Sequence, residues 1–138
     1  MYLRHIRMQE LMTARINANS VKYNKEVNKQ VAILDLHGFP LWPDSKGFRW
    51  IRRCIEIDEA YYPETLEHLF VINAPIWFTA IWAIVRPWID EVTVEKIQII
   101  GHHYEPILKK YIADDQLPTD LGGTNAHYPW KWPDNYKL

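Results

Sequence analysis

Apolar and polar positions follow two different periods along the chain, and the two alternate. Three short runs are typical of strands: residues 31–36 and 69–72, which are nearly all apolar, and residues 96–100, which alternate. The first run predicts a strand buried on both faces, as in a parallel sheet. Helices are predicted over residues 1–17, 45–61, 76–89 and 104–112, and a turn is predicted at Gly122-Gly123.

The helix predicted over residues 45–61 has the clearest amphipathic pattern. Its apolar stripe is formed by Trp50, Cys54, Ile57 and Tyr61, at positions i, i+4, i+7 and i+11. The single cysteine falls inside this stripe, so we interpret Cys54 as a core residue and not as a nucleophile.

Strands that alternate with helices predict an α/β fold, with a mostly parallel mixed sheet flanked by helices. The segment 76–89 is apolar almost all round, and Arg86 is its only basic residue. A domain of this size has trouble covering such a helix on every side. We therefore expect a hydrophobic ligand or a partner chain to cover part of it.

Composition and charge exclude several classes of protein. The chain has 16 Lys and Arg against 17 Asp and Glu, a balance that argues against nucleic-acid binding. Hydrophobic residues make up 48% of the chain, which is too many for a disordered protein. One cysteine allows no intrachain disulfide and favours a reducing compartment.

Targeting and membrane signals are weak in this sequence. The longest uncharged run, residues 71–85, is too short for a spanning helix, and the first 20 residues lack the apolar core of a signal peptide. Arg4, Arg7 and Arg15 against Glu10 resemble an organellar transit peptide, although we favour a solvated helix.

Polar residues give little sign of catalysis or metal binding. His102 and His103 are adjacent at a predicted strand end, so they point to opposite faces and fit one metal ion poorly. Asp35 and His37 form either an acid–base pair or, as we favour, a polar pair that ends a strand. Gly-rich phosphate loops are absent. We therefore expect no enzyme, no metal and no catalytic residue.

The last 14 residues, 125–138, form an aromatic tail that contains Trp130 and Trp132. Two prolines restrict it to an extended form. These tryptophans either pack on the domain itself or anchor a protein partner.

A set of short motifs resembles the CRAL-TRIO lipid-binding domain, the domain of phosphatidylinositol transfer proteins, α-tocopherol transfer protein and retinaldehyde-binding protein. In order, these motifs are AILDLHG (32–38), YYPE (61–64), VINAP (71–75), RP (86–87) with Asp90, TVEKI (93–97) and DQLPTDLGG (115–123). The resemblance implies a partial domain over residues 1–124 that lacks the family's N-terminal part.

In this family a sheet forms the floor of an apolar pocket and a mobile apolar helix closes it. The resemblance assigns that gate helix to residues 76–89. The pocket and gate residues implied by the resemblance are Ile33, Leu36, Ile76, Trp77, Phe78, Ile81, Trp82, Val85 and Trp88.

Family members that bind phosphoinositides use a Glu after Tyr-Tyr-Pro and a Thr-x-x-Lys after the gate. The matching residues are Glu64, Thr93 and Lys96. Lys96 would contact a phosphate, Thr93 would donate its hydroxyl and Glu64 would accept from inositol hydroxyls. The alternative is that Glu64 caps a turn and Lys96 is a solvated charge. Gln30 and Ala32 replace the hydroxyl residues of choline-lipid binders, so the resemblance does not extend to phosphatidylcholine.

Two functions follow as hypotheses. The first is binding or transfer of a hydrophobic ligand, such as a phosphoinositide, by a cytoplasmic protein peripheral to membranes. The second is an accessory subunit of a larger membrane complex, for example in mitochondria, that uses its apolar surface for protein contacts. Lipid, a membrane surface and a protein that supplies the missing N-terminal part are the expected partners.

Overall fold

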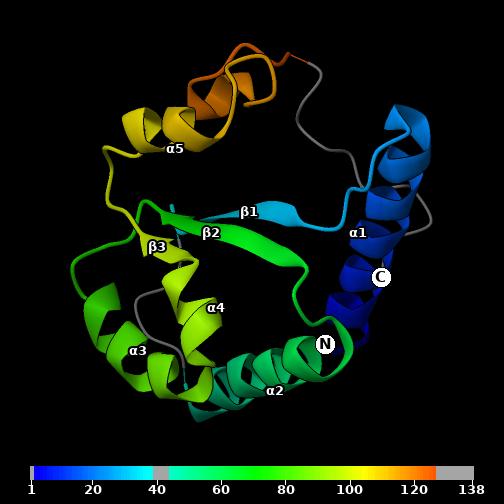
Figure 1. Cartoon of the computed structure of the whole chain (residues 1–138). Coiled ribbons are helices and arrows are strands. Elements are labelled where there is room, and N and C mark those ends of the chain that lie inside the picture. The colour runs from blue at the N-terminus through cyan, green and yellow to red at the C-terminus, as the bar shows by residue number, and fades with distance from the viewer. Residues whose placement is uncertain (1, 39–43, 127–138) are drawn as a thin grey trace. The chain divides into compact units, whose positions relative to one another are not determined.

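The computed structural model describes residues 2–38 and 44–126. The chain forms two compact units, residues 1–101 and residues 102–138. In the first unit, strands β1 (Gln30–Asp35), β2 (Leu66–Ile72) and β3 (Ile97–Ile99) form a parallel sheet in the order β1-β2-β3 (Figure 1). The predicted α/β class is confirmed.

Helices connect the parallel strands on one side of the sheet. The link from β1 to β2 is α2 (Ser45–Tyr61), and the link from β2 to β3 contains α3 (Phe78–Val85), the 3-10 turn η1 (Arg86–Trp88) and α4 (Glu91–Glu95). Right-handed crossovers between strands laid down in one direction place both links on the same face. Figure 1 shows α2, α3 and α4 on one side of the strands.

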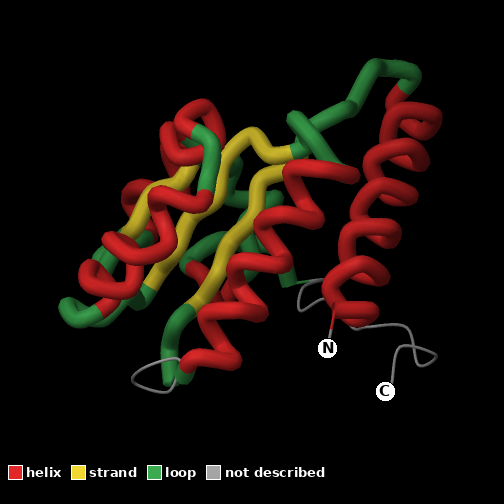
Figure 2. The backbone as a smooth tube through the Cα atoms, turned by 90° about the horizontal axis from the view of Figure 1, so that it is seen from below, coloured by secondary structure: helices red, strands yellow, loops and turns green. Residues whose placement is uncertain are grey.

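The long helix α1 (Tyr2–Tyr23) is a peripheral element of the first unit. It lies beside α2, which separates it from the strands (Figure 2). None of its side chains is buried. The predicted helix 1–17 is confirmed and continues six residues further, because the polar Asn residues after position 16 do not stop it.

The core of the first unit is centred on the middle strand. Phe70 and Ile72 of β2 have 0% of their surface exposed, and Val71 has 3%. Leu36, just after β1, is also buried. A central strand has neighbours on both edges and helices on one face, which explains why its apolar run is the most buried.

The first strand is not buried on both faces, and that prediction is wrong. Among the strands that the structure describes, β1 lies at the edge of the sheet, with Val31 42% and Leu34 47% exposed. A continuous apolar run reports the composition of a strand and not its place in the sheet. The apolar residues of β1 therefore leave a partly uncovered edge.

Two predicted boundaries in the second half of the first unit differ from the structure. The helix expected over residues 76–89 begins at Phe78 and ends at Val85, because Pro87 lacks the N–H that would extend it. The short helix α4 was not predicted at all. Consequently Lys96, expected at the start of a strand, is the residue that ends α4.

The helix predicted over residues 45–61 is confirmed in type and limits. Its N-cap is Asp44, whose side-chain Oδ1 accepts from the backbone N–H of Gly47 at 2.7 Å. Cys54 is 7% exposed, as expected for a core residue. Burial raises the pKa of its thiol to about 11, with a smaller contribution from the charge of Asp58.

The second unit contains α5 (Glu105–Tyr111) and the 3-10 turn η2 (Thr119–Leu121). Its small core includes Leu108 and Leu117, both fully buried. The predicted turn follows: Gly122 has a φ of 90°, and a Cβ on Gly123 would lie 2.0 Å from the carbonyl oxygen of Leu117. Only glycine fits at that second position.

Candidate functional site

Helix α3 has apolar side chains on both its inner and its outer side. Ile81 and Val85 are buried, with 3% and 7% of their surface exposed. By contrast, Ile84 is 41% exposed, and Ile76, just before the helix, is 93% exposed. The helix therefore has one side in the core and another that is apolar and reaches solvent. Trp77, Phe78 and Trp82 are partly exposed between these two sides.

The C-terminal end of this segment is fastened to α2. The ring of Trp88 meets Phe48 edge-on, with centroids 6.3 Å apart, and the guanidinium of Arg52 lies 5.8 Å from the Trp88 ring centre. Just beyond, the backbone N–H of Asp90 donates to Glu59 Oε1 at 3.1 Å. These contacts were not predicted, because nothing in the sequence links the exposed side of α2 to residues 88–90.

Thr93 and Lys96 are brought together by α4. Asp90 caps this helix and accepts from the backbone N–H of Thr93 at 2.9 Å. The Thr93 hydroxyl also bonds this carboxyl, and that bond is the main cause that lowers the pKa of Asp90. The backbone N–H of Lys96 donates to the carbonyl of Thr93 at 3.1 Å. The two predicted headgroup residues thus lie one helical turn apart.

Glu64 stands on a different loop, between α2 and β2. Its φ is 60°, a left-handed conformation that is uncommon for a residue other than glycine. The backbone of Lys96 lies beside Leu69, because the Leu69 N–H donates to the Lys96 carbonyl at 2.9 Å. Leu69 is five positions after Glu64, so their Cα atoms are at most about 18 Å apart. Glu64 therefore lies in the same part of the molecule as Lys96.

The surroundings of Lys96 contain an ion pair. Lys29 Nζ lies 3.0 Å from Glu67 Oε2, and both side chains are nearly half exposed. This contact is the main cause that lowers the pKa of Glu67, and the charge of Lys96 adds a smaller effect. The predicted headgroup region is therefore polar and solvent-accessible.

An open depression of about 470 Å³ lies where η1 meets α4. Its lining residues are Ala83, Arg86, Pro87, Ile89, Glu91 and Val94. Its volume lies in the range of small-molecule sites. None of the nine residues named for the pocket and gate lines it, although Ala83, Arg86, Pro87 and Ile89 belong to the predicted gate segment 76–89. Ile33 is partly buried and Leu36 is buried, so their assignment to a ligand pocket stays a prediction.

The remaining polar residues considered for catalysis or metal binding are Asp35, His37, His102 and His103. Asp35 Oδ1 accepts from the His37 N–H at 2.8 Å and from Asn73 Nδ2 at 2.9 Å, which confirms that it terminates a strand. His102 and His103 are both exposed. Within residues 2–38 and 44–126, no group of three His, Cys, Asp or Glu side chains is arranged to hold a metal ion.

Trp130 and Trp132 lie outside the described residues, and their role as a partner anchor stays a prediction. None of the helices that the structure describes combines the length and apolarity needed to cross a membrane.

Comparison with known proteins identifies the family. A family model for the CRAL/TRIO domain matches residues 3–123. Phosphatidylinositol/phosphatidylcholine transfer protein SFH11 of Arabidopsis thaliana is 39% identical over 121 residues, which are 86% of this chain and 32% of that protein. Sec14 cytosolic factor of Schizosaccharomyces pombe is 34% identical over 113 residues, which are 82% of this chain and 40% of that protein.

The fold has a solved counterpart in the crystal structure of Sfh5, with a TM-score of 0.61 over 75% of this chain and 35% of that one, at 22% identity. This chain therefore spans between about a third and two fifths of these proteins. The motifs 32–38, 61–64, 71–75 and 115–123 all fall inside the matched segment. The chain belongs to the CRAL/TRIO domain family.

Proposed function

We propose that this chain binds a phospholipid, with a phosphoinositide as the favoured ligand and α3 as the gate over an apolar pocket. Family membership and the names of its relatives as phosphatidylinositol/phosphatidylcholine transfer proteins support lipid as the ligand class. One relative is named a cytosolic factor, which supports a protein that works in the cytosol.

The observation that carries the proposal is the two-sided apolarity of α3. Ile81 and Val85 are in the core while Ile76 and Ile84 reach solvent. Covering one fully exposed isoleucine is worth about 1.5–3 kcal/mol. A lipid chain or the acyl region of a bilayer supplies such cover, whereas water does not.

The headgroup assignment rests on the chemistry of three side chains. The ammonium of Lys96 would form a charge-assisted bond to the phosphate, worth about 1.5–3 kcal/mol. The Thr93 hydroxyl would exchange its bond to Asp90 for one to the ligand. Glu64 would accept from inositol hydroxyls, and its left-handed backbone supports a role beyond loop closure, because such strain is often kept at functional sites.

The gate would pivot at its C-terminal end. Trp88 is held there by Phe48 and Arg52 of α2, and the N–H of Asp90 is held by Glu59. The opposite end, at Ile76, is exposed. The chain just before this end is also held, because the Ala74 N–H donates to the Ile100 carbonyl at 3.0 Å, so lipid would enter beside residues 75–78, between the two held points.

The first experiment asks whether the purified chain carries lipid. The protein is extracted with organic solvent and the extract analysed by mass spectrometry, and phosphoinositide binding is then measured for Lys96→Ala. We expect stoichiometric lipid in the parent and binding at least about tenfold weaker in Lys96→Ala, equal to about 1.4 kcal/mol. Lys46→Ala, which removes an exposed lysine of α2, is the matched control and should bind as the parent does. A parent without lipid, or equal binding by both variants, would refute the assignment.

A second function, an accessory subunit, is supported by the exposed edge of β1. Val31 and Leu34 reach solvent there, and an edge strand offers unpaired backbone groups to another polypeptide. In this case the chain alone would aggregate, and it would become a defined, lipid-free species only when a partner is co-expressed. A lipid-loaded monomer in the first experiment argues against this alternative.

A further inference from the structure

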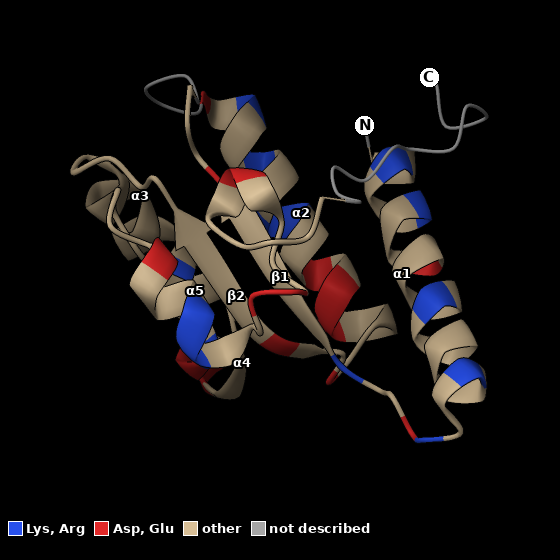
Figure 3. Cartoon of the chain, turned by 90° about the horizontal axis from the view of Figure 1, so that it is seen from above, with Lys and Arg blue, Asp and Glu red and all other residues tan. Residues whose placement is uncertain are grey.

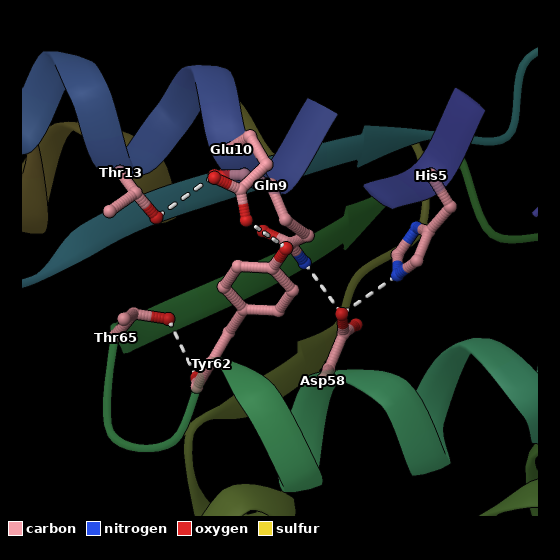
Figure 4. Close-up of polar contacts among 7 residues, drawn as sticks. All are labelled: His5, Gln9, Glu10, Thr13, Asp58, Tyr62 and Thr65. Carbon is pink, nitrogen blue, oxygen red and sulfur yellow. Dashed lines mark hydrogen bonds and ion pairs between the residues drawn. The ribbon is translucent and has the colours of Figure 1, made fainter. Parts of the chain in front are cut away.

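Helix α1 contacts α2 through His5, Gln9 and Glu10. His5 Nε2 lies 2.7 Å from Asp58 Oδ1, and Gln9 Nε2 donates to the same oxygen at 2.8 Å (Figure 4). The Tyr62 hydroxyl donates to Glu10, which raises the pKa of Tyr62 to about 12. These contacts fix how the helix is rotated about its own axis.

The opposite face of α1 carries its cations. At 3.6 residues per turn, the positions separated by 3, 4, 4, 3 and 4 residues from residue 4 onward fall in one row along the helix. We call this row the basic stripe; it consists of Arg4, Arg7, Leu11, Arg15, Ala18 and Lys22. All four charged members are exposed. Figure 3 shows their blue segments spaced along α1.

The charge of the chain is strongly segregated onto this helix. The whole chain has 16 basic against 17 acidic residues, whereas α1 has four against one. The single acid, Glu10, is engaged with Tyr62 and lies outside the basic stripe. Exposed apolar side chains flank the stripe, with Leu3 67% and Val21 83% exposed. The solvent face of α1 is therefore cationic, with an apolar border on the side of Leu3 and Val21.

We propose that the basic stripe is a docking surface for an anionic lipid bilayer, with α1 lying along the membrane and α2 behind it. The row runs from residue 4 to residue 22, 18 rises along the helix or about 27 Å, and presents its charges in a straight line. A flat surface with mobile anionic headgroups matches such a line, and long basic side chains hold their charges in the headgroup region while their apolar stems and flanking residues insert.

This surface is separate from the proposed ligand site. It lies on α1, while the gate and headgroup residues lie on α3, α4 and the loop before β2. The inference goes beyond the proposed function and does not require a lipid pocket. The alternative is that the basic stripe binds an acidic protein, and the experiment below distinguishes this from binding to a bilayer.

The experiment measures partitioning onto vesicles by co-sedimentation. Phosphatidylcholine vesicles with and without phosphatidylserine are compared for the parent and for the variant Arg4→Gln/Arg7→Gln/Arg15→Gln/Lys22→Gln. The matched control, Lys46→Gln/Arg49→Gln/Lys109→Gln/Lys110→Gln, makes the same change in net charge with exposed residues of α2 and α5. We expect the parent to prefer phosphatidylserine vesicles and the stripe variant to lose about 100-fold or more in partition coefficient, whereas the control loses much less.

Two further measurements keep the proposal open to refutation. The charge-preserving variant Arg4→Lys/Arg7→Lys/Arg15→Lys should partition as the parent does, and high salt should release the parent. Equal partitioning of the stripe variant and the control overturns the proposal. So does a parent that does not distinguish the two vesicles, which would favour the acidic protein. The stripe variant should carry as much lipid in solution as the parent does. Lipid loading therefore tests the proposed ligand site, and vesicle partitioning tests the docking surface independently.

Discussion

The Asp58 carboxylate makes two of the polar contacts that join α1 to α2, beside the bond of Tyr62 to Glu10, and its removal gives a sharp prediction. Asp58 accepts from both His5 and Gln9, two residues one turn apart on α1. The apolar side chains of α1, such as Ile6 and Ile16, are at most partly buried, so the bonds to Asp58 contribute a substantial share of what holds the helix in place. Asp58→Ala should therefore loosen α1 from α2 without unfolding the core.

The size of the effect follows from burial and from the number of bonds. A protein hydrogen bond contributes about 0.5–1.5 kcal/mol, and a buried polar group left without a partner costs about 1–3 kcal/mol. The side chain of His5 is 11% exposed and would lose its acceptor. The side chain of Asp58 is 38% exposed, so water weakens its bonds and the total loss lies toward the lower end of these ranges. We expect a loss of about 2 kcal/mol in the docking of α1, equal to about a 30-fold rise in its opening.

Amide hydrogen exchange of residues 2–23 measures this opening directly. Exchange in α1 should accelerate about 30-fold in Asp58→Ala, while exchange in β2 changes little. Glu56→Ala on the same helix is the control, because Glu56 pairs with Arg52 and Arg53 at the surface, where such pairs contribute little. Unchanged exchange in Asp58→Ala, or equal acceleration in Glu56→Ala, would refute the reasoning.

Three other perturbations test separate parts of the chain. Asp90→Ala should cost about 1 kcal/mol at pH 7 in urea unfolding by loss of the α4 cap. The pKa of Asp90 is lowered in the folded state from its usual 3.8, so the stabilisation by its carboxylate is complete above pH 3.8 and should fade as the pH falls through the lowered pKa. A cost of Asp90→Ala that does not change with pH would contradict this. Glu64→Gly should stabilise the chain by about 0.5 kcal/mol through relief of the left-handed backbone while weakening phosphoinositide binding, whereas Glu64→Ala weakens binding alone. Leu108→Ala should cost about 2–5 kcal/mol, read as faster amide exchange in α5.

The elements that the sequence predicts well are those with long periodic patterns. The stripe that includes Trp50, Cys54 and Ile57 defines α2 to the residue, because 17 residues give almost five turns of evidence. The strands are located by short apolar runs, yet the runs do not say which strand lies at an edge. Val31 and Leu34 are exposed for that reason: strand order depends on contacts between distant segments.

The candidate site is only partly readable from the sequence. Family motifs point to Glu64, Thr93 and Lys96, but the helix that brings the last two together has five residues and no periodicity of its own. Its signal is the Asp90-x-x-Thr93 spacing of an N-cap, which a search for capping residues would have found. The contact of His5 with Asp58 joins residues 53 positions apart, and no local pattern predicts it.

The most exposed apolar residue of the gate segment allows a test that separates stability from function. Ile76 is 93% exposed, so it contributes almost nothing to the free energy of unfolding of the free chain, and Ile76→Ser should leave that free energy within about 0.5 kcal/mol of the parent. Ile81→Ala, a change on the buried side of the same segment, should cost about 2–5 kcal/mol.

If lipid or a bilayer covers the outer side of α3, Ile76→Ser should lower lipid loading or vesicle binding by about tenfold or more, since the cover of one isoleucine is worth about 1.5–3 kcal/mol. If Ile76→Ser instead destabilises the free chain as Ile81→Ala does, the residue is enclosed by its own protein in solution. The reason for assigning a gate to this segment would then be gone, because the exposed side of α3 is what distinguishes a gate from an ordinary core helix.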